Sequence, residues 1–276
     1  MEYISKKDIN LNEAIRLSEK TFESTIYVSD SKVYKMYKKL KFYRRMVYLC
    51  QKEPKALLLS KSSSSQIVKS DAIILGKRVI EGIRMDYIEN SRTLYEFSRV
   101  YNDLAKYLIV GNNASKGLKE IHKDPLDIVV SDLNFFNILF DEELNTYYVD
   151  SDSYEVSGYP ATSDSKQFIQ YCDERGLREN TSQKSDRFLF MFEFLSNIFG
   201  TNIQSVPTYR YDKLAEQVAS LKNMRVYFKK IKKSEKIPNV PHVCDLIDKS
   251  DFSKQIEYRL PIINCKTTPA LKELTR

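Results

Sequence analysis

The stretch IVVSDLNFFNILFDEELNTYYVDSDSYEV, residues 128–156, constrains the fold of this 276-residue chain more than any other segment. It contains three apolar runs that are short enough for β-strands, namely Ile128–Val130, Ile138–Phe140 and Tyr147–Val149. The second and third runs predict a hairpin whose turn is Asp141–Asn145. The segment is therefore expected to fold as short strands, and the residues at the ends of these strands are expected to lie close together.

Each apolar run delivers a polar side chain at one end. Asp132 follows the first run, Asn137 precedes the second and Asp150 ends the third. Hard cations such as Mg²⁺ prefer carboxylate and amide oxygens alongside nucleotide phosphates, so Asn137 and Asp150 predict a metal site at the mouth of the hairpin. Asp152 is either a further metal ligand or the cap of the following turn. Asp132 is placed to take a proton from an attacking hydroxyl.

The spacing of these residues resembles that of a known family. Asp132-x4-Asn137 is similar to the catalytic loop H-R-D-x-x-x-x-N of protein kinases, and Asp150 lies where that family has the metal-binding Asp of D-F-G. Leu118–His122 resembles the end of the helix that leads into this loop. The forms D-L-N-x-x-N and D-x-D-S look most like a bacterial subgroup of eukaryotic-like kinases. The resemblance implies ATP and Mg²⁺ as cofactors and a catalytic role for Asp132.

The resemblance extends to both sides of this segment. Val33-Tyr34-Lys35 is similar to the V-A-I-K strand, which implies that Lys35 contacts the α- and β-phosphates of ATP. Residues 85–89 resemble the hinge between two lobes, which implies that Met85 and Tyr87 lie beside the adenine. Asp186 resembles the buried aspartate that braces the catalytic loop.

Some positions depart from the family pattern. The glycine-rich loop would fall on residues 18–25, which keep Phe22 as a nucleotide-contacting residue and contain no glycine. The helix that should provide a glutamate for Lys35 offers only Glu53, directly before Pro54. Ser131 stands where the family has an arginine. These differences predict that the N-terminal side of the site binds the phosphates of ATP in a different way from that family.

The order of elements along the chain is strands first and helices later. Residues 25–28 and 32–37 predict a hairpin, and residues 70–75 and 78–87 predict two more strands. A helix is expected from Lys39 to Glu53 and closes at Pro54. Residues 61–65, KSSSS, indicate a flexible loop. Helical periodicity then covers 93–111, 114–122, 184–199 and 211–232.

This order predicts an α+β protein with two lobes, and the resemblance makes it a two-lobed protein-kinase-like fold. Residues 1–89 form a small β-rich N-lobe with the nucleotide-binding strands and the hinge. Residues 90–276 form a larger, mainly helical C-lobe with the catalytic loop and the metal-binding segment.

Composition narrows the class of protein. The formal charge is +7, but no zinc-finger spacing, basic zipper or Arg/aromatic motif accompanies it, so we expect no nucleic-acid partner. Four cysteines occur without a C-x-x-C pair, and no apolar run could span a membrane. A cytoplasmic protein is expected.

Three functions remain open at this level. The first is an ATP-dependent protein kinase of the Ser/Thr type, in which Asp132 serves as base and the substrate is a protein hydroxyl. The second is a pseudokinase that binds without turnover, as the glycine-free loop indicates. The third is a kinase for a small molecule, similar to the aminoglycoside and choline kinases. A protein substrate is favoured over a small molecule.

Overall fold

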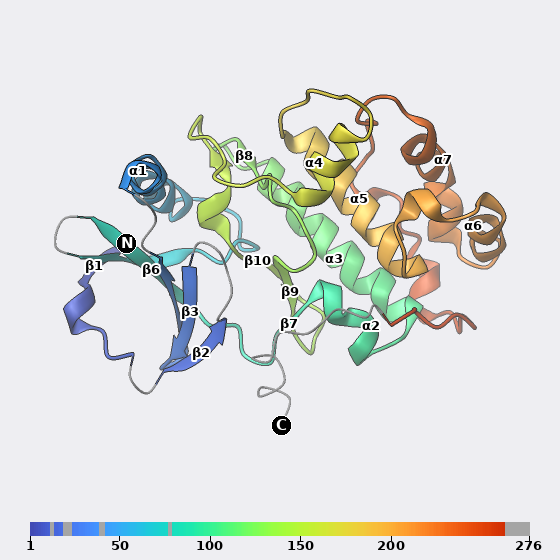
Figure 1. Ribbon diagram of the computed structural model, residues 1–276. Coiled ribbons are helices and arrows are strands. Elements are labelled where there is room, and N and C mark those ends of the chain that lie inside the picture. Colours follow the sequence, from blue (N-terminus) through green and yellow to red (C-terminus); the bar gives the residue numbers. More distant parts are fainter. Residues whose placement is uncertain (12–13, 19–23, 39–41, 77–78, 263–276) are drawn as a thin grey trace.

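The computed structural model describes residues 1–11, 14–18, 24–38, 42–76 and 79–262. A β-sheet occupies the N-terminal part of the chain, and helices dominate the C-terminal part beside it (Figure 1). The prediction of an α+β fold with strands first and helices later is therefore confirmed. No helix within the described ranges is long and apolar enough to span a membrane.

The sheet has six strands in the order β1-β5-β6-β4-β3-β2. Their bounds are β1 Glu2–Ser5, β2 Ile15–Ser18, β3 Ser24–Ser29, β4 Lys32–Tyr37, β5 Ser70–Leu75 and β6 Ile80–Asp86. The predicted hairpin is β3–β4, and its turn residues Asp30 and Ser31 have φ angles of 51° and 56°, as a tight hairpin turn requires. The sequence did not predict β1, which pairs parallel to β5. Its side chains are mostly exposed, so no alternating apolar pattern marks it.

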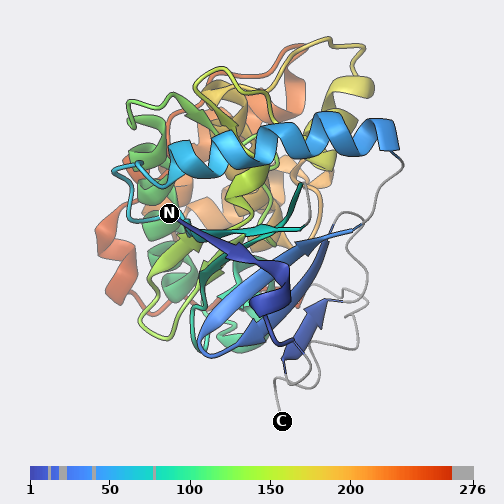
Figure 2. The same ribbon diagram turned by 90° about the vertical axis from the view of Figure 1, so that its left-hand side faces the viewer.

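Helix α1, Phe42–Leu59, lies across one face of this sheet (Figure 2). The prediction that it ends at Pro54 is wrong, because the helix continues through the proline for another turn. Proline removes one helical hydrogen bond, at a cost of about 3 kcal/mol. Ala56 and Leu59 lie beyond it and are both buried, so packing of the last turn offsets that cost.

The serine tract at 61–65, which was predicted to be a flexible loop, is partly buried and is held by hydrogen bonds to Asp124. Ser62 and Ser64 are buried. The Oγ of Ser62 and the amide N of Ser63 donate to Oδ2 of Asp124 at 2.7 and 2.8 Å. Asp124 follows α3 in the C-terminal part of the chain, so the tract ties the two parts together.

The C-terminal part contains short strands and a set of helices. Its strands are β7 Arg92–Thr93, β8 Ile128–Val129, β9 Ile138–Phe140, β10 Thr146–Tyr148 and β11 Glu155–Val156. Its α-helices are α2 Phe97–Val100, α3 Leu104–His122, α4 Lys166–Asp173, α5 Gln183–Phe199, α6 Thr208–Ala215 and α7 Ala219–Lys233. Single 3₁₀ turns include η2 Leu94–Glu96 and η3 Ser151–Ser153.

Three helix predictions need correction here. The first part of the helix expected over 93–111 is η2 and α2, and the rest joins the helix expected over 114–122 as one helix, α3, which begins at Leu104 after the Asp103 cap. The helix expected over 211–232 is divided into α6 and α7. By contrast, the helix predicted over 184–199 is confirmed as α5.

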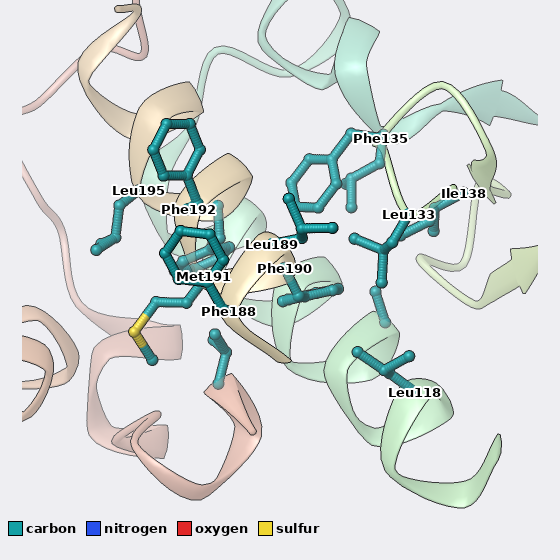
Figure 3. Packing of buried hydrophobic residues seen from close by; sticks show 14 of the residues in the cluster. Leu118, Leu133, Phe135, Ile138, Phe188, Leu189, Phe190, Met191, Phe192 and Leu195 are labelled. Atoms are coloured by element: carbon teal, nitrogen blue, oxygen red, sulfur yellow. The ribbon is translucent and has the colours of Figure 1, made fainter. Parts of the chain in front are cut away.

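Helix α5 forms the centre of the hydrophobic core (Figure 3). Its aromatic side chains pack on all sides, and the ring of Phe194 stacks on Tyr107 of α3 with centroids 5.1 Å apart. Gly111 makes this approach of the two helices possible, since a Cβ there would lie 2.2 Å from Cε2 of Phe194. The core thus fixes α3 and α5 beneath the loop that carries Asp132.

Candidate functional site

The loop that carries Asp132 is held from below by Asp186. This aspartate lies in the first turn of α5 and is fully buried. It accepts hydrogen bonds from the amide nitrogens of Val130 and Ser131 at 2.8 and 3.1 Å, and its Oδ2 lies 3.1 Å from Nε2 of His122. The predicted bracing role of Asp186 is confirmed. Because Ser131 has a φ of 59°, the chain turns sharply before Asp132.

Hydrogen bonds from Asn134, Asn137 and Ser163 orient Asp132 in this loop. Nδ2 of Asn134 donates to Oδ1 of Asp132 at 3.2 Å, and Oγ of Ser163 donates to Oδ2 at 3.3 Å. Nδ2 of Asn137 donates to the backbone oxygen of Asp132 at 3.1 Å. With its amide nitrogen turned toward the loop, Asn137 has Oδ1 as the atom that would face a cation.

Asn137 and Asp150 meet at the open end of the β9–β10 hairpin. The register pairs Ile138 with Tyr148, and the amide of Val149 donates to the oxygen of Asn137 at 3.0 Å. Asp150 then adopts a left-handed conformation with a φ of 62°, which ends the strand and begins η3. The sequence prediction that this hairpin gathers the two residues is confirmed.

Lys35 extends from β4 into the same region. It is buried, and its Nζ donates to Oδ1 of Asp152 at 2.6 Å and also to Oδ1 of Asp150. Burial by itself lowers the pKa of Lys35, but the two carboxylates more than offset burial, so the pKa lies above its usual value. The structure thus joins Lys35 to the hairpin that carries Asn137.

Asp152 is the centre of the ion-pair cluster. Only 1% of its side chain is exposed, and Nζ of Lys52 on α1 lies 2.7 Å from its Oδ2. The hydroxyl of Tyr37 donates to the same oxygen at 2.9 Å. Burial alone would raise the pKa of Asp152, whereas Lys35 and Lys52 hold it well below its usual value. In this structure Asp152 therefore pairs with both lysines, and its role as a metal ligand stays a prediction.

Glu53 does not contact Lys35. Its Oε1 accepts a hydrogen bond of 2.8 Å from the hydroxyl of Tyr3 on β1. The residue of α1 that faces the site is the neighbouring Lys52, which is fully buried. Sequence reasoning missed Lys52, because nothing local distinguishes it among the 44 lysines and arginines of the chain.

A second lysine of α1 lies close to the cluster. Lys55 is fully buried, and its Nζ has no hydrogen-bond partner. Burial, followed by the repulsion of Lys52, lowers the pKa of Lys55 to about 8. The cluster therefore contains three buried ammonium groups and two carboxylates.

The residues predicted to contact adenine lie at the end of β6. Met85 is buried and pairs with Val33 of β4 in the sheet. The amide of Tyr87 donates to the oxygen of Ser31 at 3.1 Å, so this nitrogen is already bonded within the protein. Phe22 lies outside the described residues.

The donor set suits a hard cation only in part. Asn137 and Asp150 present an amide oxygen and a carboxylate, which fit Mg²⁺ when phosphate oxygens complete its shell. Over the described ranges, no group of three or more His, Cys, Asp or Glu side chains could hold a metal ion on protein ligands alone.

Comparison with known proteins does not assign the chain to a family. No protein-family model matches it, and no curated protein matches it. The function must therefore be argued from the geometry of the site.

Proposed function

We propose that this chain is an ATP-dependent phosphotransferase that transfers the γ-phosphoryl group to a hydroxyl, and that the acceptor is a protein side chain. The observation that carries the proposal is the convergence of Lys35, Asn137 and Asp150. Lys35 contacts Asp150 across 115 positions of sequence, while the β9–β10 hairpin sets Asn137 beside Asp150. A cation, a carboxylate and an amide oxygen together are the groups that recognise metal-bound phosphates.

Each of these residues has a task in the proposed reaction. Asn137 and Asp150 would hold Mg²⁺, and Lys35 would neutralise phosphate charge. The bound Mg²⁺–ATP would supply the phosphoryl group. Asp132 would accept a hydrogen bond from the acceptor hydroxyl and take its proton as the new bond forms. The bonds from Asn134 and Ser163 hold the Asp132 carboxylate in one orientation.

One observation favours a second candidate, a pseudokinase that binds nucleotide without turnover. Lys35 is already paired with Asp150 and Asp152, and the amide of Tyr87 is already bonded to Ser31. A nucleotide would have to exchange contacts that the protein has satisfied internally.

The direct test is transfer of labelled phosphate. The protein is incubated with γ-labelled ATP and Mg²⁺, alone and with cell lysate, and label on protein is compared with label on small metabolites. Label on protein supports the proposal, and label only on metabolites indicates a small-molecule acceptor.

The variant Asp132→Asn separates chemistry from binding. It should lose transfer by at least about 100-fold, the scale of a general base, and it should keep the thermal stabilisation that Mg²⁺–ATP confers. Full activity in this variant would contradict the role of Asp132. Nucleotide binding without transfer by the wild type would favour the pseudokinase.

A further inference from the structure

The excess positive charge of this chain lies almost entirely in one segment. Residues 222–236 contain seven lysines and arginines and one acidic residue, Glu235, which gives the segment a net charge of +6. The formal charge of the whole chain is +7, so the remaining residues together contribute only +1. The molecule therefore has one cationic region, while its other charges nearly balance.

Helix α7 directs these cations to solvent on one side. Its other side consists of Leu221, Met224, Phe228 and Ile231, which are fully buried in the core. The exposed residues recur at three- and four-residue steps and so share one face of the helix. This basic face consists of Lys222, Arg225, Val226, Lys229, Lys230 and Lys233.

Most cations of the basic face have no acidic partner within the described ranges. Arg225 is paired, since its Nη2 lies 2.8 Å from Oδ2 of Asp212 on α6. By contrast, no ion pair joins Lys222, Lys229 or Lys233 to a described residue. These three lysines span eleven positions of α7, which corresponds to about 16 Å along the helix axis. They form a row of ammonium groups that an external anion can neutralise.

The composition of the basic face favours an anionic lipid surface over a nucleic acid. Its cations are mainly lysines, whose flexible ammonium groups act as point charges and do not impose the planar two-point geometry of arginine. Val226 lies among them and is 51% exposed. An apolar side chain between lysines gains from contact with the acyl boundary of a bilayer, whereas a phosphodiester backbone offers it no such contact.

We propose that the basic face of α7 docks this protein on membranes that contain anionic lipids. Lys222, Lys229 and Lys233 would contact the headgroup phosphates, and Val226 would reach the boundary below them. The apolar side of α7 is part of the core, so the helix stays folded against the protein and binds by electrostatic attraction. Figure 1 shows α6 and α7 at the end of the molecule opposite the N-terminal sheet, so the docked face does not include the region of Lys35 and Asp150.

The first test is cosedimentation of the full-length protein with lipid vesicles. Vesicles of phosphatidylcholine alone are compared with vesicles that also contain phosphatidylserine. We expect binding only to the anionic vesicles at about 0.1 M salt, and its loss at about 1 M salt, where the Debye length falls from about 10 Å to about 3 Å. Failure to bind the anionic vesicles, equal binding to both kinds, or binding that persists at high salt would overturn the proposal.

A triple variant tests whether this face is the one that binds. The combination Lys222→Gln, Lys229→Gln and Lys233→Gln should lower the partition coefficient on anionic vesicles by about 100-fold, because each lysine near the surface contributes a factor of about five. All three side chains are exposed, so the fold should be kept.

The matched control removes the same charge elsewhere. Lys7→Gln, Lys61→Gln and Lys123→Gln change exposed lysines that lie outside α6 and α7. This second triple variant should bind the anionic vesicles nearly as well as the wild type. An equal loss in the two triple variants would show that net charge, rather than the basic face, determines binding.

A single tryptophan reports which face touches the bilayer, since the chain contains none. The emission of Val226→Trp should shift to shorter wavelength on anionic vesicles, whereas that of Tyr3→Trp, at a 49% exposed position of β1, should not. A shift at Tyr3 alone, or tighter binding to single-stranded RNA than to vesicles at equal phosphate concentration, would contradict docking on lipid through this face. None of these measurements uses phosphoryl transfer, so they are independent of the proposed activity.

Discussion

At the scale of single residues, the carboxylate of Asp152 compensates the positive charges of two buried lysines. It is buried between Lys35 and Lys52, and each of its oxygens accepts from at least one of these amines. Removal of one partner from a buried ion pair leaves an uncompensated charge, which costs more than the pair contributes. The loss of Asp152 would remove the carboxylate that Lys35 and Lys52 share and would leave Asp150, which pairs with Lys35, as the remaining carboxylate of the cluster.

The variant Asp152→Asn should therefore be strongly destabilised. We expect its free energy of unfolding to fall by about 3–5 kcal/mol, measured by urea denaturation at pH 7. Asp150→Asn is the matched control, because 31% of the Asp150 side chain is exposed and water screens the charge there. Equal losses in the two variants would show that Asp152 is not the main counterion.

Because the pKa of Lys55 is lowered in the folded protein, the free energy of unfolding should depend on pH in the alkaline range. The pKa of Lys55 is lowered to about 8 in the folded protein and lies near 10.4 in the unfolded chain. Between these values the unfolded state binds more protons, so Lys55 contributes stability that grows as the pH rises from 8 to 10. Denaturation curves of wild type and Lys55→Met should show this rise in the difference between them. If the difference in the free energy of unfolding does not change with pH, the pKa of Lys55 is not lowered in the folded protein.

At the scale of elements, Asp124 joins the serine tract to the end of α3. Burial by itself raises the pKa of Asp124, but hydrogen bonds led by that of Ser62 lower it below its usual value. Its Oδ1 also accepts from the amide of Leu126 at 3.0 Å. One carboxylate thus satisfies donors on both sides of the junction.

We expect Asp124→Ala to cost about 2–3 kcal/mol, because it leaves buried donors without acceptors. Hydrogen exchange should localise the effect, with faster exchange at the amides of Ser63 and Leu126. Asp127→Asn is the control, since the Asp127 side chain accepts a long, exposed bond from Gln183 at 3.4 Å and asparagine tolerates the positive φ of 48° at this position. If the two variants lose the same stability, the junction does not depend on Asp124.

Local periodicity predicted the β3–β4 hairpin, β5, β6 and α5, but it missed β1 and it failed where distant packing determines the bounds of a helix. The break expected between 111 and 114 does not occur, because Gly111, a poor helix former, makes room for the ring of Phe194. Similarly, α1 passes through Pro54 because its last turn is buried. Neither packing partner is visible in the local sequence.

The same distinction applies to the site. Asp132, Asn137 and Asp150 could be predicted because one hairpin and one loop set their positions. Lys35 was implied only by a resemblance, and its contact with Asp150 spans 115 positions. Lys52 was missed, and Glu53 was the only partner that the sequence offered for Lys35. A one-residue step on a helix rotates a side chain by about 100°, and the sequence does not show which face is buried.

At the scale of the whole molecule, the site lies where the N-terminal sheet and the C-terminal part meet. Ile67 pairs with Tyr148 of β10, and Oγ of Ser151 donates to the oxygen of Val68 at 3.0 Å. The ion pair of Lys35 and Asp150 crosses the same junction. A ligand that binds these charged residues would therefore contact both parts of the chain.

The measurement that tests the central claim most directly is calorimetric titration of the protein with ATP, with and without Mg²⁺. We predict binding that requires Mg²⁺ and that weakens by at least about tenfold in Asn137→Ala, which removes the partly buried amide proposed as a metal ligand and leaves the ion pairs of the buried cluster intact. No binding at millimolar ATP, or equal affinity in wild type and Asn137→Ala, would contradict a nucleotide–metal site at the mouth of the β9–β10 hairpin.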